Sequence, residues 1–188
     1  MKNIEIEAKY KIDEKKYEEI LDFLMKKEFK CKEERQHDIY FSPQHFPFLG
    51  GQIDNECLRI RVLDTKNILS YKKFVDKTED KNSYCIEHEI EIEDIDTLTK
   101  ILNDLRIDKT ITIKKERKSF YIDDLLEVSL DDVDGLGKFV ELEIKNEGKL
   151  SQGINTIKEL TEKFMLSEDM RDYEGYSYLL YEKYKDNL

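Results

Sequence analysis

Hydrophobic and charged residues alternate along several stretches of the chain, in the period-two pattern that predicts β-strands. The clearest stretches are "IEIEAKYKI" (Ile4–Ile12), "CLRIRVL" (Cys57–Leu63) and "YCIEHEIEIE" (Tyr84–Glu93). Weaker strand patterns lie at Asp38–Phe41, Leu69–Val75, Thr110–Lys118, Phe120–Leu130 and Lys138–Lys145. Most of these eight predicted strands are joined by short turns, which favours an antiparallel sheet.

Helical periodicity begins after Asp13, where Tyr17, Ile20 and Leu24 share one face. Asp13 is a suitable N-cap, because its carboxylate can accept a hydrogen bond from a backbone N–H in the first turn. Further helices are predicted around Ile95–Leu105, Ile154–Phe164 and Tyr173–Tyr184. Strands and helices together predict an α+β fold, with the helices packed outside the sheet.

Several predicted strands have one apolar face and one face that carries a pair of like charges. The pairs are Glu5 and Glu7, Arg59 and Arg61, and Glu141 and Glu143. Two architectures satisfy this pattern. The charged faces can meet bulk water in an open two-layer sheet, which the pattern alone favours. Alternatively, the sheet can close around a charged interior, whose charges must then be matched by ligands, metals or one another.

The composition excludes some classes of function. The 188 residues carry a formal net charge of -11, which argues against sequence-independent binding to nucleic acid or to an anionic membrane. No apolar run approaches the ~20 residues of a membrane span, and the N-terminus does not have the pattern of a signal peptide. Three cysteines without CxxC spacing argue against structural zinc and indicate a reducing, cytoplasmic setting.

Seven short motifs are spread along nearly the whole chain. They are Glu5-Ile6-Glu7-Ala8-Lys9, "RQHDIYFSP" (Arg35–Pro43), "CLRIR" (Cys57–Arg61), "LSYKKF" (Leu69–Phe74), "ITIKKERKSFYI" (Ile111–Ile122), "VSLDDVDGLGKFVELEI" (Val128–Ile144) and "YSYLL" (Tyr176–Leu180). In content and order they resemble the CYTH, or triphosphate tunnel metalloenzyme, superfamily. The Gln-x-Asp-x-Tyr-Phe form together with the Gly-Leu-Gly hairpin is most similar to the class IV adenylate cyclase subgroup.

This resemblance implies a single CYTH domain over residues 1–188. It implies that eight antiparallel strands close into a barrel, or tunnel, with a charged interior and helices outside. One feature fits this interior poorly, because Lys115 and Arg117 share a strand face with Ile111 and Ile113. A bulge or a strand end could reconcile the two.

The resemblance also implies roles for individual residues. The expected ligands of Mg²⁺ or Mn²⁺ are Glu5, Glu7, Asp131, Glu141 and Glu143, whose oxygens suit hard cations. The expected phosphate-binding residues are Lys9, Arg59, Arg61, Lys72, Lys115 and Arg117. The expected catalytic residues are Glu5, Glu7, Lys9, Glu141 and Glu143.

The reaction implied by the closest subgroup is that of an adenylate cyclase, which converts ATP to cyclic AMP and pyrophosphate. An inorganic triphosphatase or thiamine triphosphatase that releases orthophosphate is the alternative within the superfamily. A non-catalytic module that binds polyphosphate or nucleotide is the alternative of another class. The expected partner is a triphosphate small molecule, not nucleic acid or membrane, and a homodimer is possible because the family often forms dimers.

Overall fold

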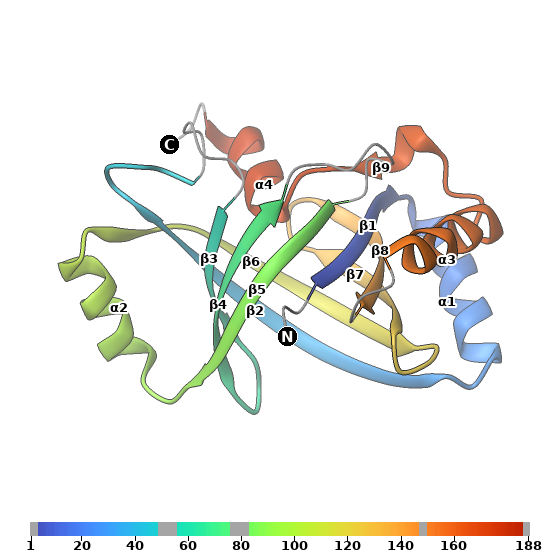
Figure 1. The fold of residues 1–188 in the computed structure, drawn as a ribbon, viewed down its shortest axis with the longest axis horizontal. Coiled ribbons are helices and arrows are strands. Elements are labelled where there is room, and N and C mark those ends of the chain that lie inside the picture. Colours follow the sequence, from blue (N-terminus) through green and yellow to red (C-terminus); the bar gives the residue numbers. More distant parts are fainter. Residues whose placement is uncertain (1–3, 49–55, 76–82, 147–149, 186–188) are drawn as a thin grey trace.

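The computed structural model describes residues 4–48, 56–75, 83–146 and 150–185, which form a curved sheet with helices around it (Figure 1). The strands are β1 (Ile4–Ile12), β2 (Lys30–Pro43), β3 (Glu56–Val62), β4 (Asn67–Val75), β5 (Ser83–Ile92), β6 (Ile107–Tyr121), β7 (Leu126–Val133), β8 (Gly137–Asn146) and β9 (Arg171–Asp172). The helices are α1 (Glu14–Lys26), α2 (Ile95–Asp104), α3 (Leu150–Lys163) and α4 (Tyr176–Tyr184), with a 3₁₀ turn at Glu168–Met170.

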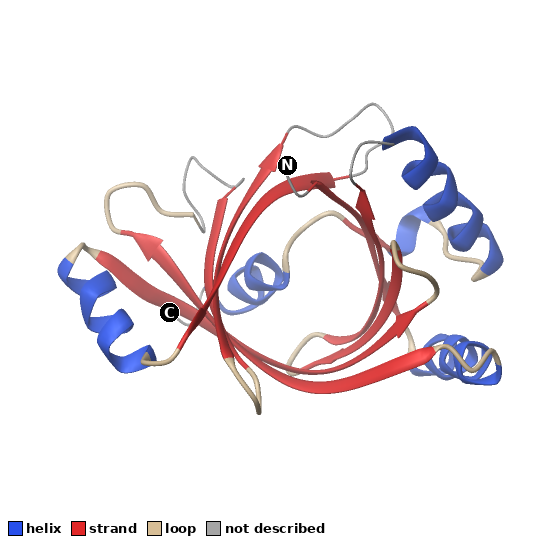
Figure 2. Cartoon of the chain, turned by 60° about the horizontal axis from the view of Figure 1, so that its bottom comes forward, coloured by secondary structure: helices blue, strands red, loops and turns tan. Residues whose placement is uncertain are grey.

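The sheet is antiparallel, with the strand order β5-β4-β3-β2-β6-β7-β8-β1-β9. β1 also pairs with β5, where Ile4–Glu7 lie opposite Ser83–Ile86. Figure 2 shows the strands curving around a central space, with helices on opposite sides of the sheet. The predicted α+β class and antiparallel sheet are confirmed. Within the described residues the sheet has nine strands rather than eight, because two residues form the short strand β9 beside β1.

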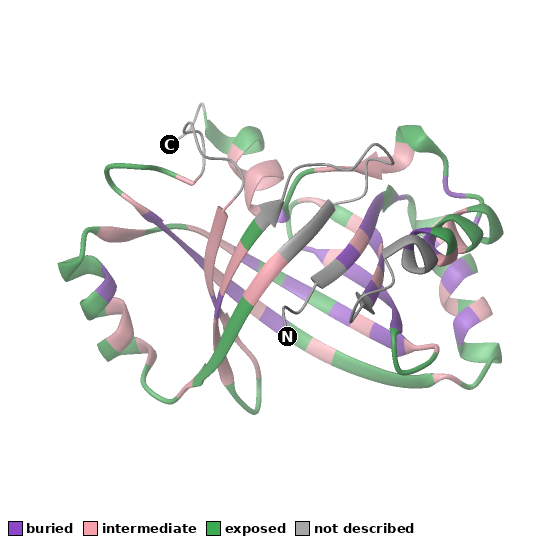
Figure 3. Ribbon diagram, in the orientation of Figure 1, coloured by how far each residue is buried: buried purple, intermediate pink, exposed green. Residues whose placement is uncertain are grey.

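The outer face of the sheet is apolar where α1 and α3 cover it. On β1 this face is formed by Ile6, Ala8, Tyr10 and Ile12, which alternate with the charged positions predicted to point inward. Side chains of β7 and β8 continue the same cluster, and the apolar faces of α1 and α3 complete it. Figure 3 shows buried residues along the strands next to α1 and α3. Burial of these side chains is the main force that keeps the curved sheet together.

A second apolar cluster also lies on the outer face of the sheet, under α2 and away from α1 and α3 (Figure 2). Phe41, Ile60 and Leu102 are its buried members, and Leu58 and Val62 pack against them. The alternation on β3 therefore continues the pattern of β1, with aliphatic side chains outside and Arg59 and Arg61 on the inner face.

The inner face changes from charged to apolar at the end nearest α4. There Tyr40, Ile113, Val133, Phe139 and Tyr176 form a buried cluster. This cluster explains why Ile111 and Ile113 share a strand face with Lys115 and Arg117. The isoleucines lie on the inner face where α4 covers it, and the basic residues lie further along the same strand.

Three predicted strands differ from the structure by three residues or more at one end. β2 and β6 extend well beyond Asp38–Phe41 and Thr110–Lys118, because they pair with each other along almost their full lengths. The predicted strand Phe120–Leu130 is wrong as a single element. A turn interrupts it, in which the Asp123 carboxylate accepts hydrogen bonds from the backbone N–H groups of Leu125 and Leu126, each at 2.8 Å.

Two other expectations concern thiols and membranes. Cys31 and Cys57 are free, the first exposed and the second partly buried. No helix within the described ranges is both long enough and apolar enough to cross a membrane.

Candidate functional site

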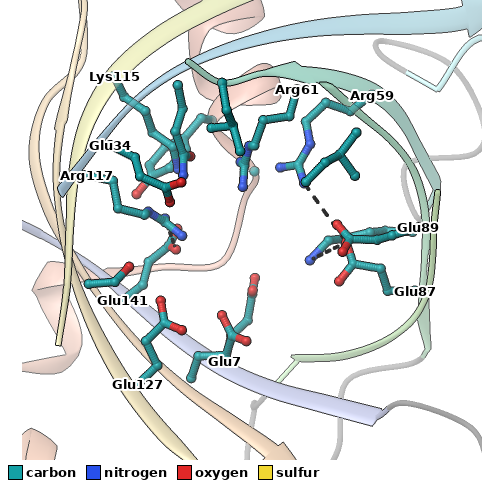
Figure 4. A pocket seen from close by; sticks show the side chains of 18 of the residues that line it. Glu7, Glu34, Arg59, Arg61, Glu87, Glu89, Lys115, Arg117, Glu127 and Glu141 are labelled. Carbon is teal, nitrogen blue, oxygen red and sulfur yellow. Dashed lines mark hydrogen bonds and ion pairs between the residues drawn. The ribbon is translucent and has the colours of Figure 1, made fainter. Parts of the chain in front are cut away.

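A cavity of about 390 Å³ occupies the space inside the curved sheet. Inward-facing side chains of β1 to β8 line it, and Gly175, Tyr176 and Ser177 line it from the start of α4. Figure 4 shows charged side chains converging from all around this space. The cavity therefore combines residues that lie far apart in the sequence.

Strand register brings the predicted charged residues side by side. In the β1–β8 pair, Glu7 lies opposite Glu143 and Lys9 lies opposite Glu141. Because side chains alternate between the two faces of a strand, all four point to the same side of the sheet. All six predicted phosphate-binding residues line the cavity: Lys9, Arg59, Arg61, Lys72, Lys115 and Arg117.

Asp38 holds the two arginines of β3. The Arg61 guanidinium donates two hydrogen bonds to its carboxylate, at 2.7 and 2.8 Å, and Arg59 lies 3.6 Å from the same group. Burial alone would raise the pKa of Asp38, but Arg59 and Arg61 hold it well below its usual range. The carboxylate therefore stays ionised and fixes the position of both guanidinium groups.

Glu87, on β5, plays a similar part on the other side of Arg59. Its carboxylate lies 3.2 Å from the Lys72 ammonium group and 4.0 Å from the Arg59 guanidinium. Lys72 therefore lines the cavity beside Arg59.

Asp131 organises the basic residues of β6. Its completely buried carboxylate accepts hydrogen bonds from Lys115 Nζ at 3.0 Å, Arg117 Nε at 2.6 Å and the Tyr176 hydroxyl at 2.9 Å. Arg117 also pairs with Glu141, on β8. Burial, followed by the neighbouring Arg117, lowers the pKa of Lys115 to about 8, although Asp131 opposes this shift. The described side chains that line the cavity do not include Asp131, which lies behind the basic residues.

The lower wall in Figure 4 is acidic. Glu7, Glu127, Glu141 and Glu143 line it from the neighbouring strands β1, β7 and β8. Glu127 lies opposite Glu143, which lies opposite Glu7, so that three glutamates form a row across three strands. The predicted ligand Glu5 belongs to β1, but its side chain lies outside the described part.

These carboxylates have the chemistry that a hard divalent cation prefers. Among the described residues, no three Asp, Glu, His or Cys side chains are already gathered as a metal site. The acidic wall therefore offers the oxygen ligands that Mg²⁺ or Mn²⁺ prefers, but in the described part of the chain these oxygens are not arranged around one point.

Lys9 connects the acidic wall to α4. Its ammonium group donates to the Glu174 carbonyl, lies 3.7 Å from Asp172 and lies 4.5 Å from the centre of the Tyr176 ring. The Lys115 ammonium group lies 4.8 Å from the centre of the same ring. Tyr176 therefore contacts two predicted phosphate-binding residues and, through its hydroxyl, Asp131.

A sequence model of the CYTH domain matches residues 3–174. The chain belongs to the CYTH domain family. A Methanocaldococcus jannaschii protein named "putative adenylate cyclase" is 33% identical over 171 residues, which are 90% of this chain and 86% of that protein. This CYTH domain thus has a relative similar over most of both lengths.

Solved structures share the fold. The PH1819 protein of Pyrococcus horikoshii has a TM-score of 0.77 at 25% identity, and the match covers 95% of this chain and 99% of that one. The "putative adenylyl cyclase" HpAC1 of Hippeastrum, described as having a dominant triphosphatase activity, has a TM-score of 0.65 at 18% identity. That match covers 97% of this chain and 96% of that one.

Several residues of this CYTH site were not predicted as site residues. They are Glu34, Gln36, Asp38, Glu87, Glu127 and Tyr176. Glu34, Gln36 and Asp38 alternate with outward-facing residues of β2. This period-two pattern would have indicated that they face inward if the strand had been predicted at its full length. Tyr176 belongs to the motif "YSYLL", but the motif could not indicate its contacts, because these depend on α4 packing against strands distant in the sequence.

Proposed function

We propose that this cavity binds the triphosphate chain of a small molecule and that the protein is a metal-dependent enzyme acting on that chain. The observation that carries the proposal is the convergence of the six predicted cationic side chains, from β1, β3, β4 and β6, on one cavity that also has an acidic wall (Figure 4). Such a cavity offers bidentate guanidinium groups and lysine point charges to phosphate oxygens. The acidic wall would be of no use to a purely anion-binding module.

In this proposal the sheet functions as a closed tunnel formed by β1 to β8. The pairing of β1 with β5 supports closure, because these strands lie at opposite ends of the eight-strand order. Closure would hold the cationic and acidic walls at a fixed separation. A fixed separation suits a rigid site that stabilises charge without reorganising.

The residues that would hold Mg²⁺ or Mn²⁺ are Glu7, Glu141 and Glu143, with Glu5 expected to join them from β1. Asp131 is assigned a different role from the one expected of a metal ligand, since its oxygens already accept hydrogen bonds from Lys115, Arg117 and Tyr176. A bound metal ion would supply positive charge to phosphate oxygens and increase the acidity of a coordinated hydroxyl group.

The first candidate reaction is that of an adenylate cyclase, supported by the name of the M. jannaschii relative. In it, the ribose 3′ oxygen forms a bond to the α-phosphorus, and the bond from that phosphorus to the bridging oxygen breaks. The electron pair of the broken bond remains on pyrophosphate, and the hydroxyl proton is released. Arg59, Arg61 and Arg117 would bind the negative charge that develops on the phosphate oxygens.

The second candidate is hydrolysis of the triphosphate with release of orthophosphate. The cationic residues extend around the cavity from Lys9 on β1 to Lys72 on β4, so a polyphosphate chain has many partners without an organic group. The triphosphatase activity named for the Hippeastrum protein, which shares the fold, also supports this candidate.

Product analysis tests both candidates. The purified protein would be incubated with Mg²⁺ or Mn²⁺ and, separately, ATP, tripolyphosphate and thiamine triphosphate, with products resolved by ³¹P NMR and chromatography. Cyclic AMP with pyrophosphate supports the cyclase, and orthophosphate without cyclic AMP supports the triphosphatase. Either activity should be lost in Glu7→Gln and kept in Glu18→Gln, which makes the same change on the exposed surface of α1. Absence of turnover with every substrate would contradict the enzymatic proposal.

A further inference from the structure

The side chain of Gln36 reaches into the basic part of the cavity. Gln36 lies on β2, opposite Lys115 of β6, and it lines the cavity although only 5% of its surface is exposed. On the same face of β2 it lies between Glu34 and Asp38. An uncharged amide therefore stands among the charged residues of the proposed phosphate site.

The Gln36 carbonyl oxygen, Oε1, is buried and has no hydrogen-bond partner within the described structure. Buried acceptors without a partner are uncommon in folded proteins, because the oxygen has lost its hydrogen bonds to water without replacing them. Its neighbours on the same face of β2, Glu34 and Asp38, carry ionised carboxylates, which accept hydrogen bonds and cannot supply the missing donor. A bound molecule in the cavity is the natural source of the missing donor.

The phosphate oxygens of a triphosphate cannot be that donor, because they are acceptors when ionised. In the described structure the hydrogen bonds of Lys115 go to Asp131 and those of Arg117 go to Asp131 and Glu141, on β7 and β8, and none goes to Gln36. What the Gln36 carbonyl requires is an O–H or N–H group beside the phosphate chain. The attacking water or hydroxyl of either candidate reaction carries such a group and must lie next to a phosphorus atom.

We propose that Gln36 Oε1 accepts a hydrogen bond from the attacking hydroxyl group and orients it toward phosphorus. This inference rests on the proposed function. In hydrolysis the attacking group is water, whose oxygen forms a bond to the terminal phosphorus while the bridging P–O bond breaks. The electron pair stays on the departing phosphate chain, and one proton of the water is released to solvent. In cyclisation the sugar hydroxyl takes the place of water.

The test compares Gln36→Met with the wild type. Methionine has a similar length and volume but no hydrogen-bond acceptor of comparable strength. We expect kcat to fall about 10- to 100-fold, as for a misoriented reactant. KM should stay within about twofold of the wild-type value, since the cations that bind phosphate are unchanged. For the same reason, the increase in melting temperature caused by tripolyphosphate in EDTA should stay within about twofold of the wild-type increase. Gln44→Met is the matched control, since Gln44 lies in the exposed loop after β2 and bonds to Asp108 at 2.7 Å.

A second variant, Gln36→Asn, keeps the amide and withdraws its carbonyl by one carbon, so it should also lower kcat while folding normally. A kcat within twofold of wild type in either variant would overturn the inference. A raised KM with unchanged kcat would do so as well, since Gln36 would then bind phosphate through its NH₂ group. These outcomes leave the proposed function intact, whereas a wild-type protein without turnover removes both.

Discussion

At the scale of single residues, the cavity depends on carboxylates that hold cations in place. Asp38 fixes Arg61 and lies near Arg59, and Asp131 fixes Lys115 and Arg117. A buried cation without a partner is very costly, so these carboxylates allow several positive charges to face one small space. They act as positioning residues, leaving the remaining donor groups of the cations available to a ligand.

Replacing Asp131 with Asn should therefore destabilise the fold strongly. Removing one charge from a buried ion pair costs about 3–5 kcal/mol, because the partner stays buried and unpaired. Asp132→Asn is the control, since Asp132 pairs with Lys138 on the more exposed side and should cost at most about 1 kcal/mol. Urea unfolding of the two variants measures the difference. Equal effects would contradict the role given to Asp131.

Acid should weaken the fold for the same reason. Burial would raise the pKa of Glu141, but Arg117, followed by Lys115 and Lys9, lowers it from 4.5 to about 2. A carboxylate with a lowered folded-state pKa stabilises the protein above its unfolded pKa, and this contribution is lost as the pH falls through the folded value. The urea midpoint should therefore decrease from about pH 5 to about pH 3, and the decrease should be smaller in Glu141→Gln. An unchanged pH dependence in that variant would contradict the assignment.

The sequence predicts individual charged residues better than it predicts their roles. Alternation and motif resemblance indicated Glu7, Lys9, Arg59 and Arg61, and the structure brings all four to one cavity. The same reasoning expected Asp131 among the metal ligands. Its hydrogen bonds to β6 and α4 could not be anticipated, because they depend on the packing of elements distant in the sequence.

At the scale of elements, α4 covers one end of the inner face. Tyr176, in its first turn, packs on Phe139 with ring centres 4.9 Å apart and donates to Asp131. Leu179 and Leu180 pack against the same apolar cluster. The helix therefore packs against the inner face next to the basic residues, and its first residues line the cavity.

Two substitutions separate the contributions of Tyr176. Tyr176→Phe removes only the hydrogen bond to Asp131 and should lower the free energy of unfolding by about 1–2 kcal/mol. Tyr176→Ala also removes the ring from the apolar cluster and from Lys9 and Lys115, and should cost about 3–5 kcal/mol. Thermal and urea unfolding would measure both. If the alanine variant were no less stable than the phenylalanine variant, the packing role of the ring would be wrong.

Element boundaries follow the sequence where local chemistry decides them. Asp13 caps α1 as predicted, accepting a hydrogen bond from the Lys16 N–H at 2.7 Å. β2 and β6 are longer than their alternation suggested, since cross-strand pairing rather than local pattern determines their ends. β9 comprises two residues, too few for a period-two pattern.

The cap of α1 gives a direct test of this local chemistry. Asp13→Ala should lower the free energy of unfolding by about 1 kcal/mol, because one N–H of the first turn loses its acceptor. Asp22→Ala, within the same helix and exposed, removes a carboxylate without removing a cap and should have a smaller effect. Unfolding midpoints of the two variants would be compared, and equal losses would argue against the capping role.

At the scale of the whole molecule, a strongly acidic chain encloses a cavity with a strongly basic wall. The formal net charge of -11 lies on a protein whose cavity gathers all six predicted phosphate-binding cations. The composition alone argues against a general affinity for polyanions. It could not predict that basic side chains gather in one cavity of an acidic protein. An anionic ligand would therefore be attracted by the cavity while most of the surface repels it.

Calorimetric titration of tripolyphosphate in the presence of Mg²⁺ tests whether the space inside the sheet binds a triphosphate. We expect saturable binding of one tripolyphosphate per chain, and both added salt and Arg59→Ala should weaken it. Arg35→Ala, which removes an exposed arginine on the outer face of β2, should leave the affinity unchanged. No saturable binding, or equal loss of affinity in both arginine variants, would contradict a triphosphate site inside the sheet.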